Sequence, residues 1–313
     1  MKIFRDFASA GNIKNPVLTI GTFDGVHIGH QKIIERLNEE AQKIGGESVL
    51  FTFYPHPRMV LYPDSHGLKL IQTQVEKLDK LRRRGLDNLI VYPFTRDFSR
   101  LTAIEFVRDY LVNELEVKKL VIGYDHHFGK NREGNIDFLK DVSDTYGFEV
   151  IEISAQDIDE VNVSSTKIRN SIMNGEMSKA ATYLGESFKL HGRVIRGKSL
   201  GKDIGYPTAN IDIETELKLV PANGVYAVNV LVPKYGIFEG MMNIGFNPTI
   251  ENSDNVSIEV HLFDFKKDIY NEYVTVQFLS RIRDEKKFES IHQLKDQLHE
   301  DEMHIRNFFA SSR

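Results

Sequence analysis

The sequence contains no cysteine, and this absence excludes several kinds of chemistry. With zero cysteines among 313 residues, the chain can have no disulfide, no thiolate zinc site and no cysteine nucleophile. No apolar run approaches the ~20 residues that span a bilayer, and the opening MKIFRDFASAGN lacks the apolar stretch of a signal peptide. We therefore expect a cytoplasmic protein that works with hydroxyl, imidazole and carboxylate groups.

An excess of charge of one sign is also missing. The formal net charge is −5, from 40 Lys and Arg against 45 Asp and Glu, so we expect no general attraction to nucleic acid. The densest basic run comprises Lys80, Arg82, Arg83 and Arg84, on an expected helix that ends at Gly85. We interpret this run as a solvated helix end rather than as a patch that binds polyanions.

Length and composition predict two ordinary globular domains. Hydrophobic residues make up 41% of the chain and charged residues 27%, and we find neither internal repeats nor low-complexity segments. A typical domain has about 150 residues, so this length indicates two. The pattern changes near residues 185 to 187, which places the expected boundary between residues 1–185 and 186–313.

The first part of the chain has the pattern of an α/β domain. From residue 17 to 153, short apolar runs alternate with amphipathic helical patterns, which is typical of a doubly wound parallel sheet covered on both faces. Ligands of such sheets lie at the carboxyl ends of the strands. Thr102 and Glu105 form a capping box that opens one helix. The expected strands are 17–23, 48–53, 88–94, 119–123 and 148–153, and the expected helices include one with Ile33, Ile34, Leu37, Ala41 and Ile44 on one face and another near 135–146.

From about residue 188 the pattern changes to closely spaced strands separated by turn residues. Six such runs predict a six-stranded antiparallel barrel, which makes the second domain all-β. The runs are FKLHGRVIR, PTANIDI, GVYAVNVLV, IFEGMMNIG, VSIEVHLFDF and EYVTVQFLSRI. A final amphipathic helix follows, and it is expected to carry Phe288, Ile291, Leu294, Leu298 and Ile305.

The strongest local signal is GTFDGVHIGH, residues 21–30, where a strand runs into a helix. His27 and His30 are about one helical turn apart, so both rings can face the same phosphates. The helix N-terminus adds oriented N–H groups and positive potential, and glycines let a nucleotide approach the backbone. Such a site can stabilise the charge that develops during nucleotidyl transfer. The nucleotide-binding residues expected here are Gly21, Phe23, Asp24 and Gly25.

A second element, VSSTKIRNSI (163–172), places hydroxyl groups ahead of Lys167 and Arg169. Ser164 or Ser165 could simply cap a helix. Beside the histidine motif we favour phosphate binding, with Arg169 on the triphosphate. The tetrad HIGH also occurs in class I aminoacyl-tRNA synthetases, but this chain has neither their length nor an anticodon-binding helical domain, so we reject that interpretation.

Residues 192–199, GRVIRGKS, fit the letters of a P-loop but not its physical context. A P-loop joins a strand to a helix, whereas the following LGKDIGYP contains two glycines and a proline and cannot start a helix. We instead expect a loop whose backbone amides cradle phosphates, followed by Thr208 and Asn210 as hard oxygen ligands suited to magnesium. A plain hairpin turn before an edge strand is the alternative. The glycines of this loop are Gly197, Gly201 and Gly205.

Four motifs in order resemble the adenylyltransferase half of the prokaryotic bifunctional riboflavin kinase/FAD synthetase family: GTFDGVHIGH, FTFYPHP, GYDHHFGKNREG and SSTKIR. The resemblance implies a Rossmann-like nucleotidyltransferase domain in which His27 and His30 meet ATP phosphates. The family usually has an aromatic residue where this chain has His126. By the same matching, the adenosine would lie near Gly123 and Asp125, the phosphates near Ser164, Thr166 and Arg169, and the flavin near Pro55, His56 and Pro57.

The second part resembles the riboflavin kinase module of the same family through GKSLGKDIGYPTAN, GVYAV, NIGFNPT, IEVHLFDF and RDEKKFES. The resemblance implies that Glu259 is the general base that takes a proton from the ribityl hydroxyl of riboflavin. It also implies that Arg283 lies against the flavin. Strand alternation alone would turn Glu259 toward solvent. The two resemblances together cover about residues 14–309.

The resemblance therefore predicts a bifunctional transferase that uses ATP twice, with magnesium as the cofactor of both steps. Riboflavin and ATP would give FMN and ADP, and FMN and ATP would give FAD and pyrophosphate. The expected partners are riboflavin, FMN, FAD and ATP, with neither nucleic acid nor membrane and at most a weak homo-oligomer. Two alternatives stay open: a nucleotidyltransferase for another phosphate ester such as phosphopantetheine, and a flavin or nucleotide sensor without turnover.

Overall fold

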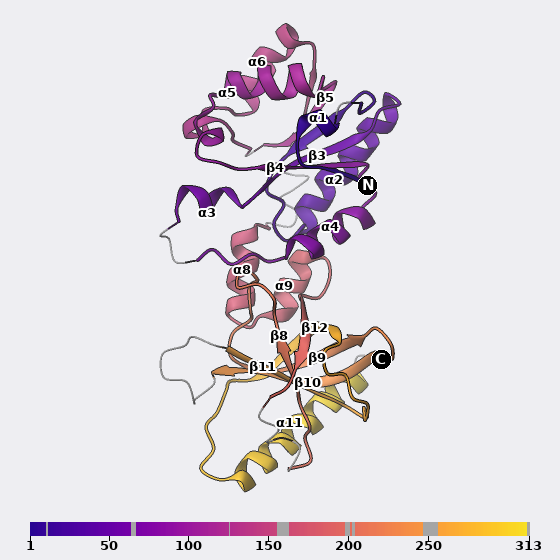
Figure 1. The fold of residues 1–313 in the computed structure, drawn as a ribbon, viewed down its shortest axis with the longest axis vertical. Coiled ribbons are helices and arrows are strands. Elements are labelled where there is room, and N and C mark those ends of the chain that lie inside the picture. The colour runs from indigo at the N-terminus through magenta and orange to yellow at the C-terminus, as the bar shows by residue number, and fades with distance from the viewer. Residues whose placement is uncertain are drawn as a thin grey trace. The chain divides into compact units, whose positions relative to one another are not determined.

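The chain forms two compact units, Met1–Ser165 and Thr166–Arg313. The computed structural model describes residues 1–10, 12–63, 67–124, 126–154, 163–197, 201, 204–246 and 256–311 (Figure 1). No helix in this described part of the chain combines the length and the apolarity needed to cross a membrane.

The first unit contains a six-stranded sheet in which every pairing is parallel. Its central strand β2 (Val17–Ile20) lies between β3 and β5, and this confirms the expected doubly wound sheet. The edge strand β1 has only three residues, too few for a periodic pattern, and sequence analysis did not predict it. In spatial order the strands are β1 (Lys2–Phe4), β4 (Asn88–Pro93), β3 (Ser48–Tyr54), β2, β5 (Lys119–Gly123) and β6 (Glu149–Ile153).

Helices cover both faces of this sheet. Alternate residues of each strand point to opposite sides, so both faces carry apolar side chains that pack against helices. Val17 and Leu50 pack with α2 (Ile28–Lys43) and α4 (Gln74–Arg83), while Leu18 and Phe51 pack with α1 (Phe7–Ala10), η2 (Phe106–Glu114) and α6 (Ile136–Tyr146). Figure 1 shows the strands between α2 and α4 on one side and α6 on the other. The remaining short helices are α3 (Pro57–Leu61), η1 (Phe98–Arg100), α5 (Ala103–Glu105) and η3 (Lys130–Arg132).

Two local predictions in this unit meet different outcomes. The capping box is confirmed: the Thr102 hydroxyl accepts from the backbone N–H of Glu105, and the Glu105 carboxylate accepts from that of Thr102.

The interpretation of the basic run as solvated is wrong for Lys80, of which only 2% is exposed. Arg82 and Arg83 do lie in solvent. Lys80 is buried because α4 turns that side of the helix toward the sheet.

The second unit is built on a closed barrel of six strands with every pairing antiparallel, and this confirms the prediction. The order around the barrel is β10-β11-β8-β7-β12-β9. Helices α8 (Ser165–Met173) and α9 (Met177–Leu184) precede the first of these strands. The strands are β7 (Lys189–Ile195), β8 (Ala209–Asp212), β9 (Gly224–Val232), β10 (Gly236–Phe246), β11 (Val256–Leu262) and β12 (Tyr273–Arg283).

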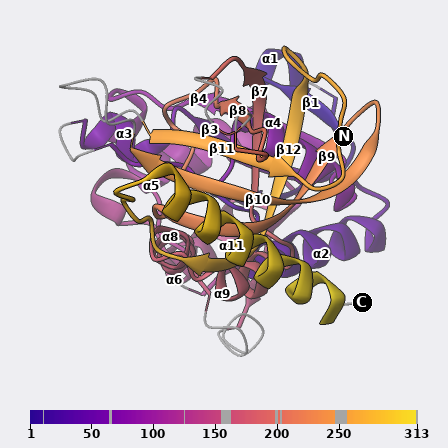
Figure 2. The ribbon, with the colours of Figure 1, turned by 90° about the horizontal axis from the view of Figure 1, so that it is seen from below.

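The C-terminal helix α11 (Ile291–Ser311) packs against β10, β9 and β12 (Figure 2). Ile305 and Phe309 join a core cluster with Tyr206 and Met241 of the barrel. The expectation that the helix carries Phe288 is wrong, because α11 begins at Ile291, which is itself 71% exposed. The buried face of α11 comprises only Asp301, Ile305 and Phe309, so its first turns extend past the core.

Candidate active sites

The loop between β2 and α2 lies where the strand order of the first sheet reverses. From β2 the chain continues to β3 and β4 on one side, and later to β5 and β6 on the other. Ligands of open α/β sheets bind in the crevice outside the carboxyl ends of the strands at such a switch point. The motif GTFDGVHIGH follows β2 directly, so the sheet places it at this crevice.

His27 and His30 lie face to face at the start of α2. His27 is the N-cap of the helix, and its Nδ1 accepts a hydrogen bond of 3.3 Å from the backbone N–H of His30. The two rings stack with centroids 3.6 Å apart and planes 17° apart, and Phe23 stacks on His30 at 4.4 Å. Because Nδ1 of His27 is an acceptor, the proton of the neutral ring is on Nε2, where it can be donated to a ligand.

Both imidazoles are uncharged at neutral pH. Burial lowers the pKa of His27 to about 4, with a smaller contribution from the positive charge of Lys80. The pKa of His30 also lies well below its usual value, through burial first and then through electrostatic interaction with His27, Lys77 and Lys80. The pair is therefore suited to donate hydrogen bonds to phosphate oxygens, and the positive potential of the α2 N-terminus is added to them.

Two glycines of the motif make this packing possible. A Cβ on Gly21 would lie 2.9 Å from the ring of Phe23, closer than real Cβ contacts allow. A Cβ on Gly29 would lie 3.3 Å from Nδ1 of His27 and 3.3 Å from the side chain of Val163. The glycines thus serve the stack of rings, a role in addition to the backbone approach that was predicted for them.

Asp24, predicted to bind nucleotide, is bonded to the chain itself. Its carboxylate accepts from the backbone N–H of Ile71 at 3.1 Å and of Gln72 at 3.4 Å, and only 4% of the residue is exposed. Its carbonyl oxygen accepts from the hydroxyl of Ser165 at 2.9 Å. Sequence analysis did not assign Ser165 this contact, because the two residues are far apart in the chain.

Lys77 and Lys80 of α4 also contact the loop, and sequence analysis missed both contacts. The Lys77 ammonium donates to the carbonyl oxygen of Thr22 at 2.6 Å and to the hydroxyl of Thr52 at 2.8 Å. Lys80 donates to the carbonyl oxygen of Gly25 at 3.4 Å. The spacing of Lys77, Lys80 and the buried Leu81 on one helical face was the available signal.

The other residues predicted for this site follow strands that neighbour β2. Pro55, His56 and Pro57 follow β3, where Nδ1 of His56 accepts from the backbone N–H of Arg58 and caps α3. Gly123 ends β5. The carboxyl ends of parallel strands lie at one edge of the sheet, so these residues share that edge with the histidines. Asp125 lies outside the described residues.

His126 occupies an aromatic environment. Its ring stacks on Phe128 with centroids 6.0 Å apart and planes 24° apart, and Phe128 packs on the core of the first unit. The imidazole thus packs as an aromatic ring would at this position.

The motif SSTKIR spans the division between the two units. Ser164 and Ser165 end the first, while Thr166 and Arg169 lie on α8 in the second. The predicted contacts of Ser164, Thr166 and Arg169 with ATP phosphates therefore stay predictions.

Glu259 lies at the centre of a second polar site, in the barrel. On β11 it pairs with Asn210 of β8 on one side and Asn243 of β10 on the other. Its carboxylate accepts hydrogen bonds of 3.0 Å from the hydroxyl of Thr208 and of 3.0 Å from that of Ser257. Both oxygens are thus oriented, and the side chain is half-buried rather than turned freely to solvent as strand alternation alone suggested.

The glycines of the preceding loop allow close contacts with β8 and the residues before it. A Cβ on Gly197 would lie 2.0 Å from the side-chain amide nitrogen of Asn210, and one on Gly201 would lie 2.2 Å from the carbonyl oxygen of Tyr206. Gly205 has a φ of 91°, which favours glycine. Strand β7 runs through Ile195, so the letters GRVIRGKS begin within a strand, as expected. Lys198, Ser199 and the rest of 198–200 and 202–203 lie outside the described residues.

Thr208 and Asn210, predicted to bind magnesium, have side chains of a suitable chemical kind. Their side chains offer a hydroxyl and an amide oxygen, the hard donors that magnesium prefers, next to the carboxylate of Glu259. Within the described ranges, no group of three or more His, Cys, Asp or Glu side chains could hold a metal by itself.

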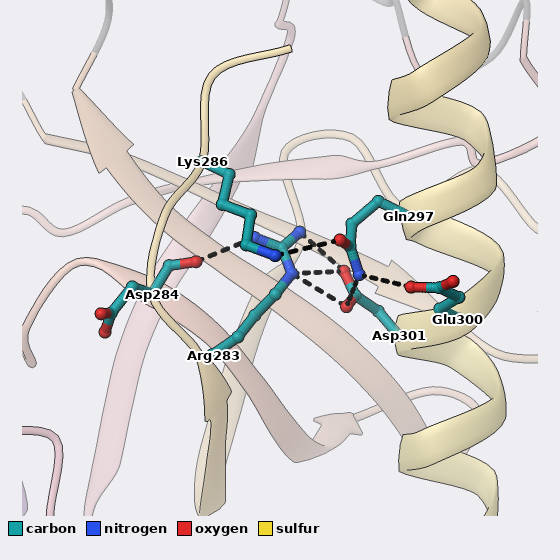
Figure 3. Close-up of polar contacts among 6 residues, drawn as sticks. All are labelled: Arg283, Asp284, Lys286, Gln297, Glu300 and Asp301. Atoms are coloured by element: carbon teal, nitrogen blue, oxygen red, sulfur yellow. Dashed lines mark hydrogen bonds and ion pairs between the residues drawn. The ribbon is translucent and has the colours of Figure 1, made fainter.

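Arg283, predicted to lie against the flavin, joins the end of β12 to α11 (Figure 3). Its Nε donates to both carboxylate oxygens of Asp301 at 2.9 and 3.0 Å, and a second nitrogen donates to one of them at 2.7 Å. The third nitrogen donates to the carbonyl oxygen of Asp284 at 2.9 Å. Gln297 adds a bond to Asp301 and accepts one from Lys286. The flavin contact of Arg283 stays a prediction.

Comparison with known proteins covers both units. A family model described as FAD synthetase matches residues 10–167, and one described as riboflavin kinase matches residues 184–309. The bifunctional riboflavin kinase/FMN adenylyltransferase of Haemophilus influenzae is 37% identical over 99% of this chain and 100% of its own length. The protein of the same name from Listeria monocytogenes is 38% identical over 95% of this chain and 93% of its own length.

A solved structure named as a macrolide-efflux protein from Streptococcus pneumoniae has the same fold over almost the whole chain. It superimposes with a TM-score of 0.88 at 35% identity, covering 97% of this chain and 98% of that one.

Proposed function

The chain belongs to the family of bifunctional riboflavin kinases/FMN adenylyltransferases and has both activities, and we propose that they use the two separate sites described above. Adenylyl transfer to FMN takes place at His27 and His30, and phosphoryl transfer to riboflavin at Glu259. The observation that carries this proposal is the stacked, uncharged histidine pair at the switch point of the parallel sheet.

In adenylyl transfer, an FMN phosphate oxygen attacks the α-phosphorus of ATP, and the bond to the departing pyrophosphate breaks. The Nε2–H group of His27 and a ring N–H of His30 donate to the phosphate oxygens on which negative charge increases, so no covalent intermediate is needed. The flavin lies near Pro55, His56 and Pro57, and the adenosine near Gly123 and Asp125. Ser164, Thr166 and Arg169 bind the polyphosphate.

In phosphoryl transfer, the Glu259 carboxylate takes the proton of the terminal ribityl hydroxyl. The oxygen of that hydroxyl attacks the γ-phosphorus of ATP, and ADP departs. Thr208 and Ser257 hold the carboxylate in place for this step. Thr208 and Asn210 would hold magnesium, which supplies charge neutralisation of the polyphosphate when it is bound. The loop of Gly197, Gly201 and Gly205 receives the phosphates with its backbone amides.

We place the functional boundary at Gly185, so that residues 1–185 serve adenylyl transfer and 186–313 serve the kinase reaction. The start of the riboflavin kinase match at residue 184 supports this boundary, although the second compact unit begins at Thr166 and includes α8 and α9. We also propose that the partners of the protein are free riboflavin, FMN, FAD and ATP, and that it acts in the cytoplasm.

The direct test is chromatography of the products formed from riboflavin, ATP and magnesium by the pure protein. FMN should appear first and FAD later, with one pyrophosphate released for each FAD. Formation of neither FMN nor FAD would support the sensor alternative. Transfer of the adenylyl group to phosphopantetheine but not to FMN would support the other nucleotidyltransferase alternative.

A further inference from the structure

Two lysines of α4 are buried beside the β2–α2 loop. Only 6% of Lys77 and 2% of Lys80 is exposed, although lysine is almost never fully buried in proteins unless it is paired. They are three residues apart, so they lie on one face of the helix. Taking an ammonium group out of water is costly, and no step of the proposed chemistry has yet given these two a role.

The segment from Ile71 to Lys80 makes hydrogen bonds to three of the four loop residues 22–25. Lys77 binds the carbonyl oxygen of Thr22, the backbone N–H groups of Ile71 and Gln72 bind the carboxylate of Asp24, and Lys80 binds the carbonyl oxygen of Gly25. These contacts fix the loop from the side of α4.

The loop needs such support because its backbone is strained. Phe23 has a φ of 48° and Val26 a φ of 38°, in the left-handed region that non-glycine residues rarely adopt. Strain of this kind persists only where the surroundings over-determine the conformation. Phe23 stacks on His30, and His30 on His27, so a loop that relaxed would move the rings out of register.

We propose that Lys77 and Lys80 are positioning residues of adenylyl transfer: they fix the loop that aligns Phe23, His30 and His27, and they add buried positive charge to a polyphosphate site. This inference rests on the proposed assignment of that site to the histidines. The charged and titratable groups that contact the loop are Lys77 and Lys80 from α4, His27 and His30 from α2, and Asp24 from the loop itself.

The positive charges of Lys77 and Lys80 also affect the protonation of the two imidazoles. Positive charge nearby disfavours a protonated ring, and in a buried site this interaction is stronger than in water. The pKa of His27 is lowered by burial and by Lys80, and that of His30 by burial, by His27 and by both lysines. The lysines thus help to keep both rings as neutral donors, while they carry the positive charge themselves.

The test replaces each lysine by methionine, which keeps the length of the side chain but not the charge. Both reactions are measured in the same preparation, and the ratio of adenylyl-transfer kcat to kinase kcat is compared with that of the unaltered protein. We expect Lys77→Met and Lys80→Met each to lower this ratio about 10- to 100-fold. The matched control is Arg82→Met, in solvent on the same helix, which should leave the ratio within about twofold.

A second readout separates the proposed role from a merely structural one. In an NMR titration of the imidazoles, the pKa of His27 should rise in Lys80→Met, because the nearby charge that helps burial to lower it is gone. Lys80→Arg should keep it low. A loop that had only lost its shape would lower the rate without this charge-dependent pattern.

The experiments distinguish failure of this inference from failure of the proposed site assignment. If Lys77→Met and Lys80→Met keep the unaltered ratio while His27→Ala loses adenylyl transfer, the inference is overturned and the site assignment stands. If His27→Ala retains adenylyl transfer, the site assignment itself fails. Because the two units could unfold separately, a lowered ratio supports the inference only where the imidazole signals of His27 and His30 in the same variant are those of a folded first unit. An unshifted His27 pKa in Lys80→Met would overturn the electrostatic part.

Discussion

The hydroxyl of Thr208 donates a hydrogen bond of 3.0 Å to the carboxylate of Glu259, while Ser257 donates to the other oxygen of the same group. Two hydroxyls from different parts of the barrel thus fix the direction in which the carboxylate faces. A general base has to be held within hydrogen-bond reach of the proton that it takes. The kinase site can therefore be tested by replacing the carboxylate itself or one of the hydroxyl groups that hold it.

Replacing the carboxylate should stop the kinase reaction alone. Glu259→Gln keeps the size and the hydrogen bond from Thr208 but cannot accept the ribityl proton, so FMN formation should fall about 10²- to 10⁴-fold. Conversion of supplied FMN to FAD should continue at the unaltered rate. Chromatography with riboflavin or FMN as substrate separates the two reactions. Full kinase activity in this variant would remove Glu259 from the mechanism.

Replacing one support should have a smaller effect. Ser257→Ala removes one of two hydrogen bonds to the carboxylate, and a bond to a charged group is worth roughly 1.5–3 kcal/mol, so kinase kcat should fall about tenfold or more. KM for riboflavin should change little, because Ser257 would not touch the substrate. Ser257→Thr, which restores the hydroxyl, should recover most of the rate. A change in KM alone would contradict this role.

His27 has a structural and a chemical role that can be separated. His27→Ala should abolish FAD formation while FMN accumulates, and should also cost about 1 kcal/mol of stability as the N-cap of α2 is lost. His27→Asn keeps a good N-cap residue without the imidazole. It should therefore unfold at nearly the unaltered temperature and still lack adenylyl transfer. Recovery of FAD formation by the asparagine would show that the cap alone is needed.

The adenylyl-transfer reaction should weaken at alkaline pH. Burial lowers the pKa of Lys77 to about 8, against the opposing charge of Asp24. The ammonium is charged below this pH and loses its proton above it, so the ratio of adenylyl transfer to kinase activity should fall as the pH rises past about 8. Lys77→Arg stays charged throughout and should flatten the profile. A ratio that is constant from pH 7 to 9.5 in the unaltered protein would count against a charged Lys77.

The ion pair between Arg283 and Asp301 should stabilise the kinase unit. The side chain of Asp301 is 1% exposed and that of Arg283 15%, and removal of one partner from such a pair costs about 3–5 kcal/mol. Asp301→Asn should therefore lower the unfolding temperature of this unit and its kinase activity. Asp296→Asn on the same helix, whose side chain is 64% exposed, should change stability by less than about 0.5 kcal/mol. Equal effects of the two changes would contradict the prediction.

Much of the fold was accessible from the sequence, because its signals are local. Strand β9 and strand β5 coincide with the apolar runs that predicted them. The histidine motif could be placed at the sheet edge because strand, turn and helix follow one another in the chain. Ser257 could also have been found, since it lies two residues before Glu259 on the same face of β11.

The contacts that sequence analysis missed join distant parts of the chain. Asp301 comes 18 residues after Arg283, and Ser165 comes 141 residues after Asp24. Neither pair forms a periodic pattern, so only the fold reveals it. Lys80 was misassigned because adjacent arginines made the segment look like a solvated charge run, whereas the helical face that it shares with Leu81 decides its position.

The closure of the barrel also bears on how the protein behaves in a crowded solution. Each strand of the ring has a neighbour on both sides, so none presents a long unpaired row of N–H and C=O groups to another molecule. The open sheet does have two rims. One is the three-residue β1, and the other, β6, carries Glu149 and Glu152 in ion pairs with Lys119 and Lys140. Short or charged rims of this kind discourage edge-to-edge pairing with a second molecule.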